Sequence, residues 1–171
     1  MTDPFEHEVA RCFQRQFPAL FRYLDRALGD PELASDIAQE SFVRLFERGA
    51  MPDEPASWLI TVARNLVRDG ARKAGRRLRL LEQAGRDEEL GADEAGPAAA
   101  LEQQEARERV RAALAQLPPR DRDILLLRHS GYSYREISVA LELAEASVGT
   151  ILLRAGVQFR STYAALNGEP D

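Results

Sequence analysis

The sequence predicts an all-α fold of two small helical domains, residues 1–80 and 106–171, joined by a flexible acidic linker at 81–105. Apolar residues recur at helical spacing along most of the 171 residues. No segment shows the sustained apolar and polar alternation that marks half-buried strands. Residues 81–108 hold nine acidic and two basic side chains, interspersed with helix-breaking glycines and a proline, whereas each flanking segment carries a net charge of only +1.

Proline and glycine signals divide the N-terminal domain into helices. Pro18 interrupts the first apolar stripe and predicts two helices or a kink. Asp30-Pro31 predicts a capped helix start, and Gly49 predicts its end. A loop and then a further helix, from about residue 57 to 73, follow. The positions expected to face inward are Phe13, Phe17, Leu20, Phe21, Leu24, Leu28, Leu33, Ile37, Phe42, Leu45, Phe46, Leu59, Val62, Ala63 and Leu66.

The C-terminal domain has the pattern of a helix-turn-helix. Pro118-Pro119 ends one helix, and the next is expected from Arg120 to about His129. Ser133 and Glu136 have the spacing of a capping box, which predicts a well-defined helix start. A short helix to about residue 141 and a longer one from about 145 to beyond 160 complete the expected motif.

A basic stretch follows the start of the third helix of the N-terminal domain. Residues 64–79 hold seven basic side chains against Asp69 alone. Helical spacing places Thr61, Arg64, Asn65, Arg68 and Arg72 on one face, opposite the apolar one. Such a face suits the phosphate backbone and exposed bases of a nucleic acid. A solvated helix surface is the alternative, although solvated faces usually mix charges of both signs.

The composition argues against an enzyme, a metal protein and a membrane protein. Cys12 is the only cysteine, His7 and His129 are the only histidines, and no phosphate-binding loop or catalytic motif is present. No apolar run approaches the length of a membrane span, and the acidic start does not resemble a signal peptide. We therefore expect a cytoplasmic protein without a cofactor or metal.

Four segments in order resemble the extracytoplasmic-function (ECF) group of bacterial sigma-70 RNA polymerase sigma factors. They are residues 36–42 (DIAQESF), 58–66 (WLITVARNL), 117–120 (LPPR) and 131–137 (GYSYREI). The resemblance covers nearly the whole chain outside the linker. It implies a transcription initiation factor that binds core RNA polymerase, at the β′ clamp helices and the β flap, and promoter DNA. It also implies an anti-sigma protein as a further partner.

The resemblance assigns roles to individual residues. Asp36, Gln39, Glu40 and Arg44 correspond to the segment that grips the β′ clamp helices. The loop at 49–56 corresponds to the one that holds an unstacked base of the −10 element. The residues expected to recognise and melt that element are Thr61, Arg64, Asn65, Arg68, Arg72, Lys73, Arg76 and Arg77.

The C-terminal domain resembles the part of these factors that reads the −35 element. Ser147, Thr150, Ile151 and Arg154 would enter the major groove, and Arg135 would contact phosphate. Two glutamates depart from the closest subfamily pattern, because Glu142 replaces a glycine and Glu145 a proline. Gly156, Val157 and Gln158 stand where basic residues are usual. These departures keep a second interpretation open, a sigma-like regulatory protein that no longer initiates transcription.

Overall fold

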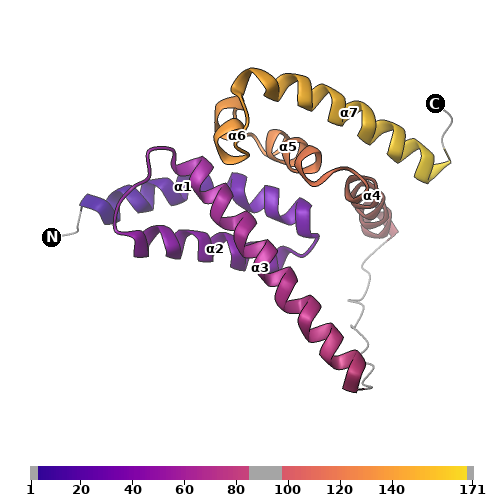
Figure 1. The fold of residues 1–171 in the computed structure, drawn as a ribbon, viewed down its shortest axis with the longest axis horizontal. Coiled ribbons are helices and arrows are strands. Elements are labelled where there is room, and N and C mark those ends of the chain that lie inside the picture. The colour runs from indigo at the N-terminus through magenta and orange to yellow at the C-terminus, as the bar shows by residue number, and fades with distance from the viewer. Residues whose placement is uncertain (1–3, 85–97, 169–171) are drawn as a thin grey trace.

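The computed structural model describes residues 4–84 and 98–168, with the side chains of 4–76 and 101–168. Within these ranges the chain forms seven helices and no strand, which confirms the predicted all-α class (Figure 1). The helices fall into an N-terminal group, α1 to α3, and a C-terminal group, α4 to α7.

The N-terminal group consists of α1 (Pro4–Leu28), α2 (Pro31–Arg48) and α3 (Pro55–Ala84). The sequence predicts that Pro18 either divides or kinks the first helix. The division is wrong, because α1 continues through Pro18. Proline in a helix interior costs about 3 kcal/mol. Leu20 and Leu24, both fully buried on the turns that follow, contribute apolar burial that offsets this cost.

The start and end of α2 are as predicted, but its inward face is rotated. Asp30 Oδ1 accepts a hydrogen bond from Leu33 N at 3.0 Å, and Gly49 ends the helix at φ 72°. Leu33 and Phe46, predicted to be buried, are 44% and 52% exposed. The buried face of α2 runs through three small residues together with Phe42 and Leu45, so Leu33 and Phe46 lie outside it. The buried positions are Ala34, Ala38, Ser41, Phe42 and Leu45.

The C-terminal group consists of α4 (Ala98–Ala115), α5 (Pro119–His129), α6 (Tyr134–Ala140) and α7 (Glu145–Asn167). Each of the first three packs against α7, and α6 with α7 forms the predicted helix-turn-helix.

The predicted capping box at the start of α6 is confirmed. Ser133 Oγ accepts from Glu136 N at 3.2 Å, and Glu136 Oε2 accepts from Ser133 N at 2.8 Å. The flanking Tyr132 and Ile137 are both buried, as a hydrophobic staple requires.

Both ends of the predicted linker at 81–105 are helical. Helix α3 continues to Ala84 and α4 already begins at Ala98. The stretch between them, 85–97, lies outside the described residues. The domain boundaries predicted from composition, 1–80 and 106–171, remain a prediction.

The two helix groups pack against each other. Helix α1 contacts α5, and α3 contacts α6. Buried residues of both groups, including Leu24 and Ile60 on one side and Ile124 and Ile137 on the other, belong to one apolar cluster. The sequence alone did not indicate whether the groups touch.

Candidate nucleic-acid interface

Helix α3 presents an exposed polar row that begins near its start and continues along its basic stretch. Thr61, Asn65, Arg68 and Arg72 are exposed, while Leu59, Ile60 and Ala63 on the opposite face are buried. Because helical neighbours at spacings of three and four share a face, the amide and the guanidinium groups line up. Within the described residues, Arg68 and Arg72 take part in no ion pair.

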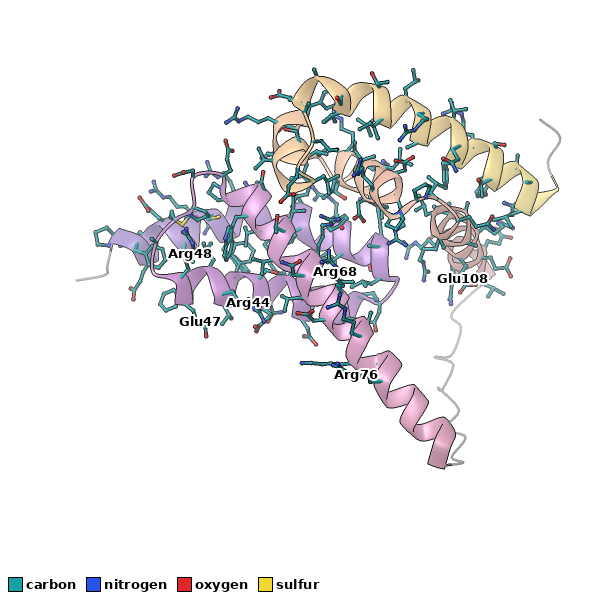
Figure 2. All side chains as sticks on the ribbon, in the orientation of Figure 1. Arg44, Glu47, Arg48, Arg68, Arg76 and Glu108 are labelled. Carbon is teal, nitrogen blue, oxygen red and sulfur yellow. The ribbon has the colours of Figure 1, made fainter. Side chains whose placement is uncertain are left out.

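The basic row continues where α3 extends beyond the other helices (Figure 2). Lys73 and Arg76 are exposed, and Figure 2 shows Arg76 at the start of this extension. Arg77 belongs to the same helix, but its side chain is not among those that the structure describes. Lys73 and Arg76 are therefore accessible to a polyanion.

Arg64 does not join this row. Its side chain is 25% exposed, and its Nε and Nη2 lie 3.0 and 2.9 Å from Asp123 Oδ2 on α5. Tyr23 OH on α1 donates to Asp123 Oδ1 at 3.3 Å. Burial, together with the negative charge of Asp123, raises the pKa of Tyr23, so the phenol remains protonated and keeps donating.

The loop between α2 and α3 is held by Arg48. Its Nη1 donates to Ala50 O at 2.9 Å, and its guanidinium lies 6.0 Å from the ring centroid of Trp58. Trp58 is partly buried against the core, so its ring supports the loop from one side.

An open groove lies between α1 and this loop. Its lining combines two arginines with a methionine from the loop and a buried thiol, whose pKa is raised by burial. The lining residues are Glu8, Arg11, Cys12, Gln14, Arg15 and Met51.

The outer face of α2 carries the residues predicted to bind polymerase. Asp36, Gln39, Glu40 and Arg44 are all exposed, and Arg44 Nε lies 3.1 Å from Glu40 Oε1. Besides Leu33 at the start of α2, two further large apolar residues of this helix, Val43 and Phe46, are exposed, at 48% and 52%. Sequence reasoning missed both because it placed Phe46 inside and gave Val43 no role. Ala34 and Ala38 are the signal in the sequence from which the buried face of α2 could have been predicted.

In the C-terminal helix-turn-helix, only part of the predicted −35 set is open to solvent. Ser147 and Thr150 are exposed, whereas Ile151 is partly buried against the core. Arg154 is 65% exposed, but its Nη2 lies 3.1 and 3.3 Å from the two oxygens of the buried Asp121. The half of α7 that is predicted to enter the major groove therefore offers hydroxyl groups and one arginine that is already paired.

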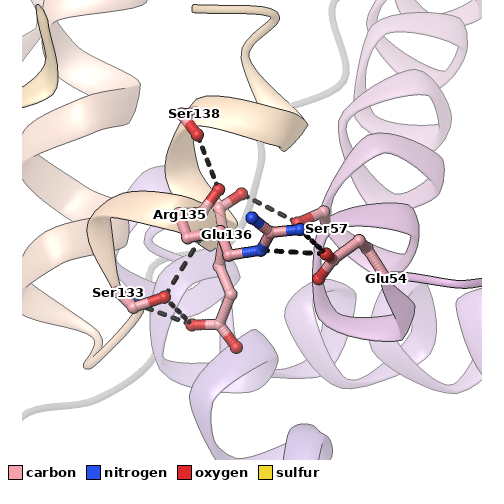
Figure 3. A network of polar contacts seen from close by, with 6 residues as sticks. All are labelled: Glu54, Ser57, Ser133, Arg135, Glu136 and Ser138. Atoms are coloured by element: carbon pink, nitrogen blue, oxygen red, sulfur yellow. Dashed lines mark hydrogen bonds and ion pairs between the residues drawn. The ribbon is translucent and has the colours of Figure 1, made fainter. Parts of the chain in front are cut away.

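Arg135, predicted to contact phosphate, points at the N-terminal group instead (Figure 3). Its Nη2 and Nε lie 2.6 and 3.0 Å from Glu54 Oε1, at the end of the loop between α2 and α3. The hydrogen bond and the charge of Glu54 raise the pKa of Arg135. Beside this pair, Ser57 Oγ donates to Glu136 O at 2.9 Å.

Sequence reasoning missed the acids that pair with the predicted DNA-binding arginines, which are Glu54, Asp121 and Asp123. The spacing of Asp123, Ile124, Leu127 and Ser130 could have placed Asp123 on the buried face of its helix. Its partners could not be found in this way, because they come from helices far away in the sequence.

Among the described side chains of residues 4–76 and 101–168, no three from His, Cys, Asp or Glu are grouped as a metal site would need. In the same residues, no helix combines the length and apolar character of a membrane span.

Comparisons with known proteins match both helix groups of the chain. The sigma-70 region 2 family matches residues 12–77, and the sigma-70 region 4 family matches 107–155. The chain is 32% identical over 154 residues to the ECF RNA polymerase sigma factor SigL of Mycobacterium tuberculosis, covering 86% of this chain and 84% of SigL. It is 33% identical over 173 aligned positions to EcfG of Rhodopseudomonas palustris, covering 97% and 86%.

Two further similarities are more limited. The probable RNA polymerase sigma factor RfaY of Xanthomonas campestris is 34% identical over 137 residues, which cover 77% of this chain but only 34% of RfaY. A solved structure of the sigma factor RpoE from Bartonella quintana, in complex with the anti-sigma factor NepR, has a TM-score of 0.61. It is 21% identical, covers 94% of this chain and 97% of RpoE, and shows the shared fold.

Proposed function

Because the chain belongs to the ECF group of RNA polymerase sigma factors, we propose that α2 docks onto core polymerase and α3 holds the melted −10 element of the promoter. The chain is a sigma factor, a subunit that binds core polymerase and directs transcription initiation. It acts by binding, and the chemistry of RNA synthesis belongs to the polymerase. It acts in the bacterial cytoplasm, where RNA polymerase is found.

The exposed row on α3 carries the proposal for the −10 element. Thr61, Asn65, Arg68 and Arg72 combine hydrogen-bonding groups for bases with cations for phosphate on a single helix face. The loop fixed by Arg48 lies at the start of the same helix and is suited to hold an extruded base. Extruding a base from the DNA duplex costs a few kcal/mol of stacking and pairing free energy, which contacts with the protein pocket must offset.

The outer face of α2 supports the polymerase contact. Asp36, Glu40 and Arg44 supply charges for orientation, and Val43 and Phe46 supply the apolar area that a stable interface needs at its centre. We assign this face to the β′ clamp helices and the C-terminal helix-turn-helix to the β flap and the −35 element.

The proposal is tested by reconstitution of the polymerase. The full chain is mixed with core polymerase from its source, and the holoenzyme transcribes fragmented genomic DNA whose transcript ends are then sequenced. We expect co-migration with core and transcripts that share a two-part motif upstream of their starts. Failure to co-migrate at any ionic strength would contradict the proposal.

Replacing Arg68 and Arg72 together by alanine distinguishes the proposed DNA-binding row of α3 from the proposed polymerase-binding face of α2. We expect core binding to persist while promoter opening falls by about tenfold or more, because two phosphate contacts are lost. Permanganate footprinting of unpaired thymines measures the opening, and co-migration measures core binding. The matched control, Arg107→Ala with Arg109→Ala, removes two exposed arginines from α4. Equal loss of both activities would mean that the α3 row is structural.

A second function, a sigma-like regulator that binds polymerase without initiating, is favoured by one observation. Arg154, the arginine left in the groove-facing half of α7, is held by Asp121. Co-migration with core but no promoter-dependent transcripts would support this alternative.

An anti-sigma partner is also proposed. The related RpoE was solved with NepR, and the exposed α2 face of this chain is a surface that an inhibitor could cover. Such a protein would compete with core polymerase for the chain.

A further inference from the structure

One arginine contacts both ends of the loop that is proposed to hold the extruded base. Arg48 is the last residue of α2, and its Nη1 donates to Ala50 O at 2.9 Å, near the start of the loop. Its guanidinium carbon also lies 6.0 Å from the ring centroid of Trp58, in the first turn of α3. The side chain of Arg48 therefore connects the segment that enters the loop with the helix that follows it.

The backbone is fixed at both ends of this loop. Gly49 ends α2 at φ 72°, a left-handed conformation that glycine adopts without strain, and its N–H donates to Phe46 O at 3.1 Å. At the other end, Trp58 N donates to Glu54 O at 3.0 Å. A side-chain restraint between these ends therefore acts on a short segment with few remaining conformations.

Arginine can make both contacts at once because its guanidinium is planar. The N–H groups donate in the plane of the guanidinium, while its faces remain available to stack on an aromatic ring. A lysine ammonium also donates hydrogen bonds and carries the same charge, but it has no planar face. The two contacts of Arg48 therefore depend on the shape of its side chain as well as on its charge.

We propose that Arg48 is a positioning residue that fixes the loop at 49–54 in the shape that receives the extruded base. The inference rests on the proposed function, because it takes this loop as the holder of that base. An ordered loop loses little conformational freedom when its ligand binds, so more of the contact free energy remains for extruding the base. Arg48 acts through Ala50 and Trp58, and it contacts neither the base nor a phosphate.

The test uses holoenzyme reconstituted from the full chain and core polymerase. The probe is a fluorescein-labelled single strand that carries the −10 element of a promoter identified by the transcript sequencing, and both strands are tried. An abasic site replaces one base at a time, and fluorescence anisotropy measures each affinity. In the native holoenzyme we expect one abasic position to lower the affinity by about tenfold, which identifies the base held by the loop.

The variant Arg48→Ala is expected to lose this sensitivity to the missing base. It should bind the complete strand about tenfold more weakly and show almost no further loss at the abasic position, because both changes remove the same contact. Arg48→Lys should restore only part of the affinity. The slope of log K against log salt should stay the same, whereas loss of a phosphate contact would change it by about 0.7.

Two further measurements complete the test. Arg107→Ala, at an exposed position of α4, removes the same charge and should bind like the native chain. Trp58 is the only tryptophan of the 171 residues, so its fluorescence reports on the loop in the free chain. We expect acrylamide to quench this fluorescence more strongly in Arg48→Ala, with unchanged helix content by circular dichroism. If Arg48→Ala does not fold, Arg48→Lys tests the same effects at smaller size.

The outcomes separate this inference from the proposed function. An abasic loss as large in Arg48→Ala as in the native holoenzyme would overturn the positioning role, and so would unchanged quenching of Trp58. A shallower salt dependence in the variant would show that Arg48 binds phosphate instead. If no abasic position weakens binding by the native holoenzyme, the loop holds no base, and the proposed role of the loop is wrong together with the inference.

Discussion

Glu142 adopts a backbone conformation that favours glycine. Its φ is 55°, and it follows α6 at the position where the chain reverses. Leu143 N donates to Ser138 O at 2.8 Å and Glu142 N to Val139 O at 3.4 Å, the hydrogen bonds of a Schellman motif. The sequence identified this position as one where the family has glycine, but only the structure shows that the glutamate keeps the left-handed turn.

Glu142→Gly is therefore expected to stabilise the chain. A non-glycine residue in this region costs about 1–2 kcal/mol, part of which glycine loses again through its freedom in the unfolded chain. We expect the free energy of unfolding to rise by about 0.5–1 kcal/mol, measured by urea denaturation. Glu142→Ala is the control, since it removes the charge but keeps the Cβ atom. An equal gain in both variants would show that the charge, and not the backbone, is the cause.

Arginine roles illustrate what residue spacing can and cannot predict. The exposure of Asn65, Arg68 and Arg72 followed directly from helical periodicity. The positions of Arg64 and Arg135 did not, because each is held by a carboxylate distant in the sequence. Spacing within one helix carries no information about such partners.

At the scale of elements, the docking face of α2 gives a direct prediction. Glu40→Lys reverses a charge at the proposed clamp contact and is expected to weaken core binding by about tenfold or more. The lost pair with Arg44 costs only about 0.3–0.5 kcal/mol in helix stability, too little to unfold the chain. Competition for core polymerase against a labelled sigma factor measures the effect.

The control for this substitution is Glu105→Lys, the same reversal at an exposed position of α4. It is expected to leave core binding unchanged. If Glu40→Lys binds core polymerase with unchanged affinity, Glu40 is not part of the polymerase contact. An equal loss of affinity in Glu40→Lys and Glu105→Lys would show that the net charge is the cause.

Helix ends were predicted better than helix faces. The signals at Asp30, Gly49 and Ser133 act locally, through hydrogen bonds within a single turn, so a sequence reading can find them. The face of α2 and the continuity of α1 through Pro18 depend on packing between helices. Contacts between helices determine both features, so neither can be predicted from the residue pattern of a single helix.

For the whole molecule, the shared contact surface predicts one thermal transition. Buried residues of both helix groups belong to one cluster, and four of their helices meet across the interface. We expect the calorimetric and van't Hoff enthalpies of the native chain to agree, as in a two-state transition. Replacing Asp123 by asparagine and Glu54 by glutamine removes two ion pairs between the groups and should lower the transition temperature, while the shared apolar cluster keeps a single peak. Two peaks in the native chain would contradict this coupling.

The sequence predicted the architecture of the molecule but not the closeness of its halves. Order of motifs, helical class and the helix-turn-helix all followed from local patterns and resemblance. The interface is made by residues such as Arg22 and Ser130, separated by 108 positions. Contacts of that range leave no periodic signal.

The direction of protein synthesis gives the ion pair of Arg64 and Asp123 a consequence during translation. Ribosomes add about 5–20 residues per second, and Asp123 follows Arg64 by 59 positions. Arg64 therefore exists for about 3–12 s before the carboxylate that will hold it has been made. Helix α3 ends at Ala84, so the three N-terminal helices leave the ribosome about 2–8 s before Asp123 does. During that time they meet polymerase without this acid from the later helices.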